Sequence, residues 1–207
     1  MKKWKLLATL AVVLQAGLVV VACESTTDTN EPGLEVALNT LPPGVVGCTS
    51  ASRIKQSTDG ITIFVTGTRG PDDIDCTAAD MRVNVSAGRG NDVVTGSRFD
   101  DVVTAGDGDD VVLGGAGADD LSGGNGCDRL EGGDGDDVEL DGGPDNDNDS
   151  CSFTQGPGGV FGGAGDDLLN GGRGDDDLDG GVDTDVCNGG KGADTFTACE
   201  TQNDPDL

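Results

Sequence analysis

A nine-residue repeat restricts the possible folds of this chain more than any other feature of its sequence. Six blocks follow one another without a gap over residues 87–140: AGRGNDVVT, GSRFDDVVT, AGDGDDVVL, GGAGADDLS, GGNGCDRLE and GGDGDDVEL. Four more begin at Gly162: GGAGDDLLN, GGRGDDDLD, GGVDTDVCN and GGKGADTFT. The eighth position is apolar in every block except the one with Glu139. The sixth is always aspartate: Asp92, Asp101, Asp110, Asp119, Asp128, Asp137, Asp167, Asp176, Asp185 and Asp194. A short fixed period of this kind is typical of a solenoid, in which each repeat adds one structural unit.

Each block supplies the parts of a turn and of a short strand. Glycine at the first, second and fourth positions lets the backbone adopt positive φ and leaves carbonyl oxygens unshielded by a Cβ. In a strand over positions seven to nine, successive side chains point to opposite faces, so the eighth residue points inward. Calcium takes six to eight oxygen ligands, which carboxylates and backbone carbonyls can provide. The repeat therefore predicts a thin apolar core flanked by turns that bind a cation.

These blocks resemble the hemolysin-type, or RTX (repeats-in-toxin), calcium-binding nonapeptide G-G-x-G-x-D-x-U-x. The resemblance covers about half of the chain, and it implies an all-β fold, a parallel β-roll or β-helix solenoid. In that family two blocks form one coil, and each ion lies between turns two blocks apart. The resemblance therefore implies about six Ca²⁺ ions. The paired ligands would be Asp92 with Asp110, Asp110 with Asp128, Asp101 with Asp119, Asp119 with Asp137, Asp167 with Asp185, and Asp176 with Asp194.

Two departures and one alternative qualify this interpretation. Phe99 and Asp183 stand where the fourth glycine is expected, so we expect distorted turns or weaker binding there. The alternative is a disordered acidic linker, because low hydrophobicity and high net charge oppose a packed core. Disorder does not predict an apolar residue two places after nearly every repeat aspartate. Stacked aspartates about 4.8 Å apart repel one another unless a cation lies between them, so without calcium we expect an unfolded chain.

The segments beside the repeats carry weaker signals. Residues 34–86 are expected to cap the first coil, because the alternating stretches GITIFVTG and DMRVNVS flank a degenerate first repeat with Asp72 as a further ligand. Residues 141–161 interrupt the arrays, either as a degenerate repeat in which Gly142, Gly143 and Asp147 keep the spacing or as a surface loop. Residues 162–200 hold the second array and a C-terminal cap, and residues 201–207 form a tail. The sequence leaves open whether the two arrays form one continuous solenoid.

The first residues resemble a bacterial lipoprotein signal. Lys2, Lys3 and Lys5 precede an apolar run over residues 6–21, and a small residue then precedes Cys23. The resemblance implies a signal peptide over residues 1–22 and lipid attachment at Cys23. Because Glu24 rather than aspartate follows, it also implies the outer membrane or the cell surface. An uncleaved anchor is the alternative, but the run is shorter than the ~20 residues that span a bilayer. Residues 23–33 are polar and are expected to form a flexible tether.

Six cysteines remain once Cys23 is set aside: Cys48, Cys76, Cys127, Cys151, Cys187 and Cys199. An even number in an exported chain predicts disulfides, with fifteen possible pairings. Pairing between sequence neighbours is favoured, because each link would then tie a cap or loop to the adjoining coil. Zinc is the rival use of cysteine clusters, but the chain has no histidine and no C-x-x-C pair.

The charge balance and the missing residue types restrict the function. The formal net charge is −27, which disfavours nucleic acid and anionic membrane surfaces as partners. The absence of histidine excludes H-E-x-x-H zinc sites and Ser-His-Asp triads, and no G-x-S-x-G motif is present. We therefore expect that the protein is not an enzyme. We expect a calcium-binding lipoprotein of the cell envelope that folds on binding Ca²⁺ and has a structural, adhesive or matrix role.

An alternative function is an accessory or regulatory subunit. Such a subunit would present a calcium-rigidified surface to a partner enzyme or polysaccharide. The outward-facing valines at position seven motivate this alternative, because they could form an exposed apolar strip: Val93, Val102, Val111 and Val138. More often, valine at such positions only favours strand geometry.

Overall fold

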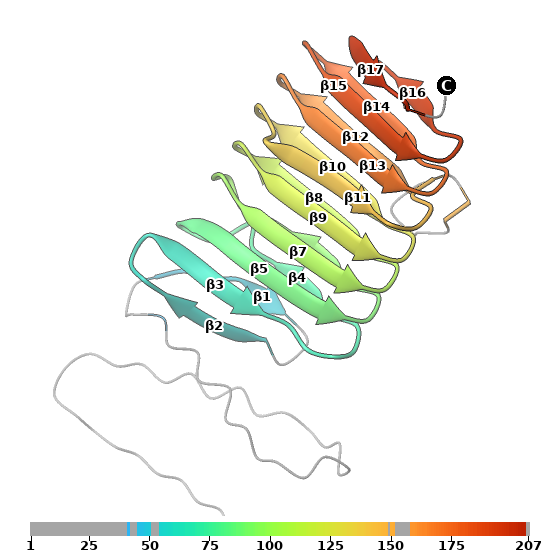
Figure 1. Cartoon of the computed structure of the whole chain (residues 1–207). Helices are drawn as coiled ribbons and strands as arrows, with labels where there is room; N and C mark the ends of the chain where they lie inside the picture. Colours follow the sequence, from blue (N-terminus) through green and yellow to red (C-terminus); the bar gives the residue numbers. More distant parts are fainter. Residues whose placement is uncertain (1–40, 42–44, 51–53, 149, 152–157, 206–207) are drawn as a thin grey trace, which may run out of the picture.

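The structure is a computed structural model that describes residues 41, 45–50, 54–148, 150–151 and 158–205. The expected signal peptide, Cys23 and the tether over residues 23–33 lie outside the described residues. Every regular element within them is a strand, and the strands form the all-β solenoid that the repeats predict (Figure 1). No helix in this part of the chain is long and apolar enough to cross a membrane.

Two sheets lie in two layers and run the length of the solenoid, because successive strands alternate between them (Figure 1). The eight-stranded sheet contains, in order, β1 (Thr49–Ser50), β4 (Asp73–Asp75), β6 (Val93–Thr95), β8 (Val111–Ala116), β10 (Arg129–Asp134), β12 (Gly159–Ala164), β14 (Asp177–Val182) and β16 (Thr195–Thr197). The nine-stranded sheet contains β2 (Lys55–Thr58), β3 (Thr62–Thr66), β5 (Arg82–Arg89), β7 (Val102–Asp107), β9 (Asp120–Asn125), β11 (Glu139–Gly143), β13 (Leu168–Arg173), β15 (Val186–Lys191) and β17 (Thr201–Asn203).

The strands pair in parallel along nearly the whole stack, so each repeat lies beside the repeat two blocks away. Val94 pairs with Val112, for example, and Val103 with Leu121. Only the N-terminal end differs among the described strands: β1 pairs with β4, and β2 with β3, in antiparallel fashion. The role of residues 34–86 as a cap remains a prediction.

The core is a narrow column that contains one large inward side chain per strand through most of the repeats, and more than one in β3 and β5. The fully buried members include Val94, Val103, Val112, Leu121, Leu130, Leu140, Val160, Leu169 and Cys187. In residues 61–65 the alternation holds for Ile63 and Val65, which are buried, whereas Ile61 is 70% exposed. A thin core leaves little apolar burial per residue, so the turns must contribute to stability.

One position of the core column differs from the expectation. Glu139 occupies the eighth position of its block but is exposed, and Leu140 is the buried residue that pairs with Leu121. The cause is a one-residue insertion before β11, where Val138 projects outward and is 59% exposed. A shift of one residue reverses which side chains face the core, so the local register follows the leucine rather than the nine-residue count.

The two repeat arrays form one continuous solenoid, which settles the point that the sequence left open. β10 pairs with β12, and β11 pairs with β13, across the interruption. The coil runs regularly to Asp147 and resumes at Gly159, whose N–H donates to the Asp128 carbonyl oxygen at 3.0 Å. The interruption is therefore shorter than the expected 141–161 segment, because the stack includes the residues up to Asp147 and those from Gly159 onward.

Candidate metal centre

Aspartates in the turns between strands form two columns, one along each edge of the solenoid. Along each column, up to its last aspartate, the N–H of one aspartate donates to Oδ1 of the aspartate one coil further on, at 2.6–3.1 Å. The first aspartate column contains Asp72, Asp92, Asp110, Asp128, Asp147, Asp176 and Asp194. The second contains Asp101, Asp119, Asp137, Asp167 and Asp185. All the aspartates predicted as ligands lie in these columns, and Asp147 joins them.

The column carboxylates are buried, and one oxygen of most of them is not satisfied. Every column aspartate from Asp72 to Asp185 has an exposed fraction of 3% or less. Within the described residues, Oδ2 has no hydrogen-bond partner at Asp92, Asp110, Asp119, Asp128, Asp137, Asp147, Asp167, Asp176 and Asp185. A buried polar atom without a partner costs free energy and requires an explanation, such as an ion. The repetition of the same orphaned atom in successive coils indicates one common ligand.

The glycine at position one keeps open the space that these oxygens face. A Cβ built on Gly114 would lie 2.7 Å from the Gly132 carbonyl oxygen and closer still to Asp119 Oδ2. The same two kinds of oxygen surround Gly123. A Cβ built there would lie 2.8 Å from the Gly142 carbonyl oxygen and closer still to Asp128 Oδ2. Two hydrogen-bond acceptors thus converge without a donor between them. A cation satisfies such an arrangement, and any side chain at position one would fill the space.

Burial and mutual repulsion disfavour the charged form of these aspartates. Loss of solvent raises the pKa of Asp128 and Asp137 to about 7 and that of Asp147 to about 8. Hydrogen bonds from the neighbouring backbone N–H groups oppose the rise, and the adjacent column carboxylates add to it. The same causes raise the pKa of Asp110, Asp119 and Asp176 to about 6. At neutral pH, part of these carboxyl groups would therefore remain protonated in the calcium-free fold. A bound divalent cation would favour their ionised form.

The donor set fits calcium, although side chains alone do not complete a site. No three His, Cys, Asp or Glu side chains are grouped to hold a metal ion within the described residues. Each pair of neighbouring turns offers two carboxylates, and the glycine carbonyl oxygens that face the same space are available as further ligands. An all-oxygen set of carboxylates and carbonyls suits a hard cation such as Ca²⁺ and does not suit zinc, which prefers nitrogen and sulfur.

The first carboxylate of each column is an exception, because protein donors satisfy it. Asp72 accepts hydrogen bonds from the Thr68 N–H at 2.6 Å and the Thr68 hydroxyl at 3.2 Å. Asp101 accepts the equivalent bonds from Ser97, at 2.5 and 3.0 Å. Both hydroxyl residues replace the glycine at position two. Ligand roles for Asp72 and Asp101 remain predictions, and these donors compete with a cation for their oxygens.

The two departures at the fourth position have different structural outcomes. Asp183 adopts the positive φ of the glycine it replaces, with φ of 88°. Phe99 is not among the residues with positive φ in the described chain, and its N–H instead donates to the Ser97 hydroxyl at 3.1 Å. The turn before Asp101 therefore differs from the glycine-rich turns. The turn before Asp72 has the same form, because Gly70 also lacks positive φ and its N–H donates to the Thr68 hydroxyl at 3.2 Å. The hydroxyl residue at position two, and not Phe99 alone, therefore accompanies this form of turn.

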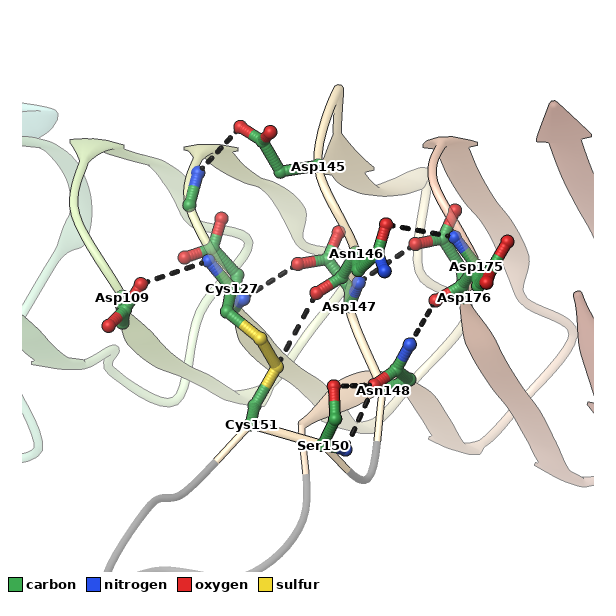
Figure 2. The surroundings of a disulfide bond; sticks show 12 residues. Asp109, Cys127, Asp145, Asn146, Asp147, Asn148, Ser150, Cys151, Asp175 and Asp176 are labelled. Carbon is green, nitrogen blue, oxygen red and sulfur yellow. Dashed lines mark hydrogen bonds between the residues drawn. A yellow bond between two sulfur atoms is a disulfide. The ribbon is translucent and has the colours of Figure 1, made fainter. Parts of the chain in front are cut away.

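The interruption contributes a column aspartate that the predicted ligand set did not include. Asp147 accepts from the Asp128 N–H at 2.6 Å and donates to Asp176 at 2.8 Å (Figure 2). Asn148 follows it and bonds the Asp175 carbonyl oxygen (Figure 2). The spacing of Gly142, Gly143 and Asp147 was the signal, since it reproduces positions one, two and six.

Three disulfides join sequence neighbours: Cys48 to Cys76, Cys127 to Cys151, and Cys187 to Cys199. This is the pairing that the sequence analysis favoured. The Cys127–Cys151 disulfide lies beside the first column. It joins the turn that precedes Asp128 to the segment that follows Asp147 (Figure 2). The expected lipid attachment at Cys23 lies outside the described residues.

The four valines expected at position seven do not form one strip. Val93 pairs with Val111 on the eight-stranded sheet, and Val111 is only 3% exposed. Val102 pairs with Asp120 on the nine-stranded sheet, and Val138 is the inserted residue before β11. The apolar strip predicted for partner binding is therefore wrong in this form.

Comparison with known proteins identifies the repeat. The family model of the RTX calcium-binding nonapeptide repeat (4 copies) matches residues 86–121, 113–148 and 161–196. These matches cover the coils that carry most of both aspartate columns, including Asp147. No curated protein and no solved structure matches the chain in the same comparisons.

Proposed function

This chain belongs to the proteins with RTX calcium-binding nonapeptide repeats, and from this premise we propose that it binds a row of Ca²⁺ ions along both columns and folds as it does so. The β-roll of these repeats is a non-catalytic calcium-binding fold. The observation that carries the proposal is the buried Oδ2 atom that lacks a partner in successive coils. When the unfolded chain has no preformed site, the free energy of ion binding contributes directly to folding.

The continuous stack changes the number of ions that we propose. Besides the pairs expected within each array, it places Asp147 between Asp128 and Asp176, and Asp137 beside Asp167. If Asp72 and Asp101 are set aside because Thr68 and Ser97 satisfy them, eight neighbouring pairs remain. We therefore propose about eight ions in place of about six.

A calcium titration followed by far-ultraviolet circular dichroism tests the proposal on the full-length protein. We expect a cooperative gain of β signal with calcium and little change with magnesium, which keeps its water shell more tightly. A chain already folded in chelator would show that the disulfides and the core are sufficient. A chain still disordered in millimolar calcium would return the acidic-linker interpretation.

We propose in addition that the protein is a non-enzymatic lipoprotein of the cell envelope, with a structural, adhesive or matrix role. The basic start, the apolar run and Cys23 support export and lipid attachment. Three disulfides fit an oxidising compartment. Labelling with an alkyne-tagged fatty acid in a bacterial host should mark the wild type and not Cys23→Ala. Equal labelling of both proteins would exclude attachment at Cys23.

A second candidate function is an accessory subunit that presents a calcium-rigidified surface. Its support is the outer face of the eight-stranded sheet, where half-buried Leu113 and Phe161 flank Glu131 in register. Arg129 lies over the Phe161 ring at 4.3 Å and pairs with Glu131 at 2.9 Å. Binding to a partner enzyme or polysaccharide should then require calcium and be weakened by Phe161→Ser. If neither calcium nor this substitution changes the binding, the surface is not used.

A further inference from the structure

The second column does not end with a repeat aspartate. After Asp185 the nine-residue period points to Asn203, but the residue in the column is Glu200. The Asp185 N–H donates to Glu200 Oε2 at 2.8 Å, as each column aspartate donates to its successor. The Thr201 N–H donates to the Asp185 carbonyl oxygen at 3.0 Å, which reproduces the bond from Val186 to Asp167. Glu200 therefore occupies the place of a sixth-position aspartate, although it follows Asp185 by 15 residues rather than 18.

The last turn is three residues shorter than a repeat, because it lacks the glycine-rich loop, and this places Glu200 in the column. Ala198 lies one coil after Gly180, and Cys199 alone separates it from Glu200. Ala198 adopts a φ of 50°, which is uncommon for a residue with a Cβ. The disulfide from Cys199 to the buried Cys187 and the pairing of Thr201 with Val186 hold the segment on both sides. The chain thus maintains an unfavourable backbone conformation where it places Glu200.

The oxygens at this end repeat the arrangement of the interior turns. Asp185 is fully buried, and its Oδ2 has no hydrogen-bond partner in the described structure. A Cβ built on Gly180 would lie 2.6 Å from this atom and also against the Ala198 carbonyl oxygen. At Gly132, the corresponding space is bounded by Asp137 Oδ2 and the Gly162 carbonyl oxygen. The Ala198 carbonyl oxygen thus takes the place of a glycine carbonyl.

We propose that Asp185, Glu200 and the Ala198 carbonyl oxygen form one further Ca²⁺ site, which closes the second column from outside the nonapeptide repeats. The inference rests on the proposed calcium binding. Glu200 lies beyond residue 196, where the family match ends. Glu200 is an exposed residue, and its longer side chain reaches the backbone N–H of the buried Asp185. The Cys187–Cys199 disulfide acts here as a positioning link, because it fixes the residue next to Glu200.

The test counts bound calcium by equilibrium dialysis for the full-length wild type, Glu200→Gln and Glu139→Gln. Glutamine keeps an acceptor for the Asp185 N–H but removes the charge, so we expect one ion fewer per chain, out of about nine. Glu139 is an exposed glutamate on β11 that is not one of the column carboxylates, and its substitution should leave the count unchanged. Equal counts for wild type and Glu200→Gln would overturn the terminal site while leaving the repeat sites intact.

Two further results separate this inference from the proposed function. A wild type that binds no calcium at all would contradict calcium binding by the repeats, and the terminal site with it. Anomalous diffraction from calcium-loaded wild-type crystals needs no variant and should show a peak between Asp185 and Glu200. Peaks in the repeat turns without one at this position would contradict the terminal site alone.

Discussion

At the scale of single residues, the glycines of each block serve two distinct purposes. Those at positions two and four adopt positive φ, as Gly115 and Gly117 do at 119° and 122°, and their role is conformational. Gly114 at position one has no such φ, and its role is spatial, since its missing Cβ leaves room for Asp119 Oδ2 and the Gly132 carbonyl oxygen. A substitution at position one therefore tests the cation space without forcing a left-handed residue.

We expect Gly114→Ala to weaken both folding and calcium binding. The new methyl group would overlap the Asp119 carboxylate of its own turn and the Gly132 carbonyl of the neighbouring coil, at a cost of about 1–3 kcal/mol. The thermal midpoint in calcium should fall by roughly 3–10 °C, and the calcium midpoint of folding should rise. Circular dichroism measures both.

Gly70→Ala is the matched control for this substitution. A Cβ added to Gly70 would meet no atom within 4 Å, and this glycine has no positive φ. The change should therefore be neutral or stabilise by up to about 1 kcal/mol through the unfolded chain. Equal losses in both variants would show that the space beside Asp119 is not the cause.

Residue patterns predicted the repeat aspartates and the inward column, because both follow a fixed count. They could not predict Leu140 in place of Glu139, since a one-residue insertion changes the register without altering the composition of the block. Glu200 was beyond the pattern for a similar reason: its turn is three residues shorter, and only strand pairing restores the alignment. Asp147 was visible as a spacing but not as a ligand until the coil around it was known.

At the scale of elements, the segment between β11 and β12 is the point where the stack is interrupted. The separation between bonded column aspartates rises there from 18 to 29 residues in the first column and to 30 in the second. The pairing of β10 with β12 nevertheless continues in register. The Cys127–Cys151 disulfide ties Cys151 to the turn that precedes Asp128, so Cys151 lies beside the first column (Figure 2).

Replacing both Cys127 and Cys151 by serine should destabilise the calcium-loaded protein. The disulfide closes a loop with a sequence separation of 24, and constraining a loop of this size stabilises by about 3 kcal/mol. The thermal midpoint should fall by roughly 6–12 °C. Hydrogen exchange should accelerate most at the Asp128 and Asp147 amides, which lie beside the disulfide.

Ser150→Ala keeps the disulfide and serves as the control for the serine pair. Ser150 is exposed, and both its N–H and its hydroxyl donate to the Asn148 side chain. The change removes only the exposed hydroxyl bond, so it should remain within about 0.5 kcal/mol. A double serine variant as stable as this control would show that the connection is held by its column contacts alone.

At the scale of the whole molecule, the charge of −27 must be neutralised for the coils to stack. Ion pairs in which at least one side chain is well exposed join Arg82 to Asp100, Arg89 to Asp107 and Arg129 to Glu131. Such pairs contribute little in water. Protons and divalent cations are the two remaining means of neutralising the columns, and they should substitute for one another in holding the solenoid together.

This substitution predicts opposite pH dependences with and without calcium. Burial raises the pKa of Asp128 and Asp137 to about 7 and of Asp147 to about 8, whereas the unfolded chain titrates near ~3.9. A raised pKa in the folded state contributes stability that is fully present below the unfolded pKa and is lost as pH rises through the folded values. The calcium-free chain should therefore be more stable at pH 5 than at pH 8. In saturating calcium the ionised carboxylates are the bound form, so stability should instead decline as pH falls toward 5. The β signal in circular dichroism at both pH values in calcium-depleted buffer would measure the first trend, and thermal midpoints at both pH values in calcium-containing buffer would measure the second. A calcium-free chain that is more stable at pH 8 would mean that the buried columns are not what keeps it unfolded.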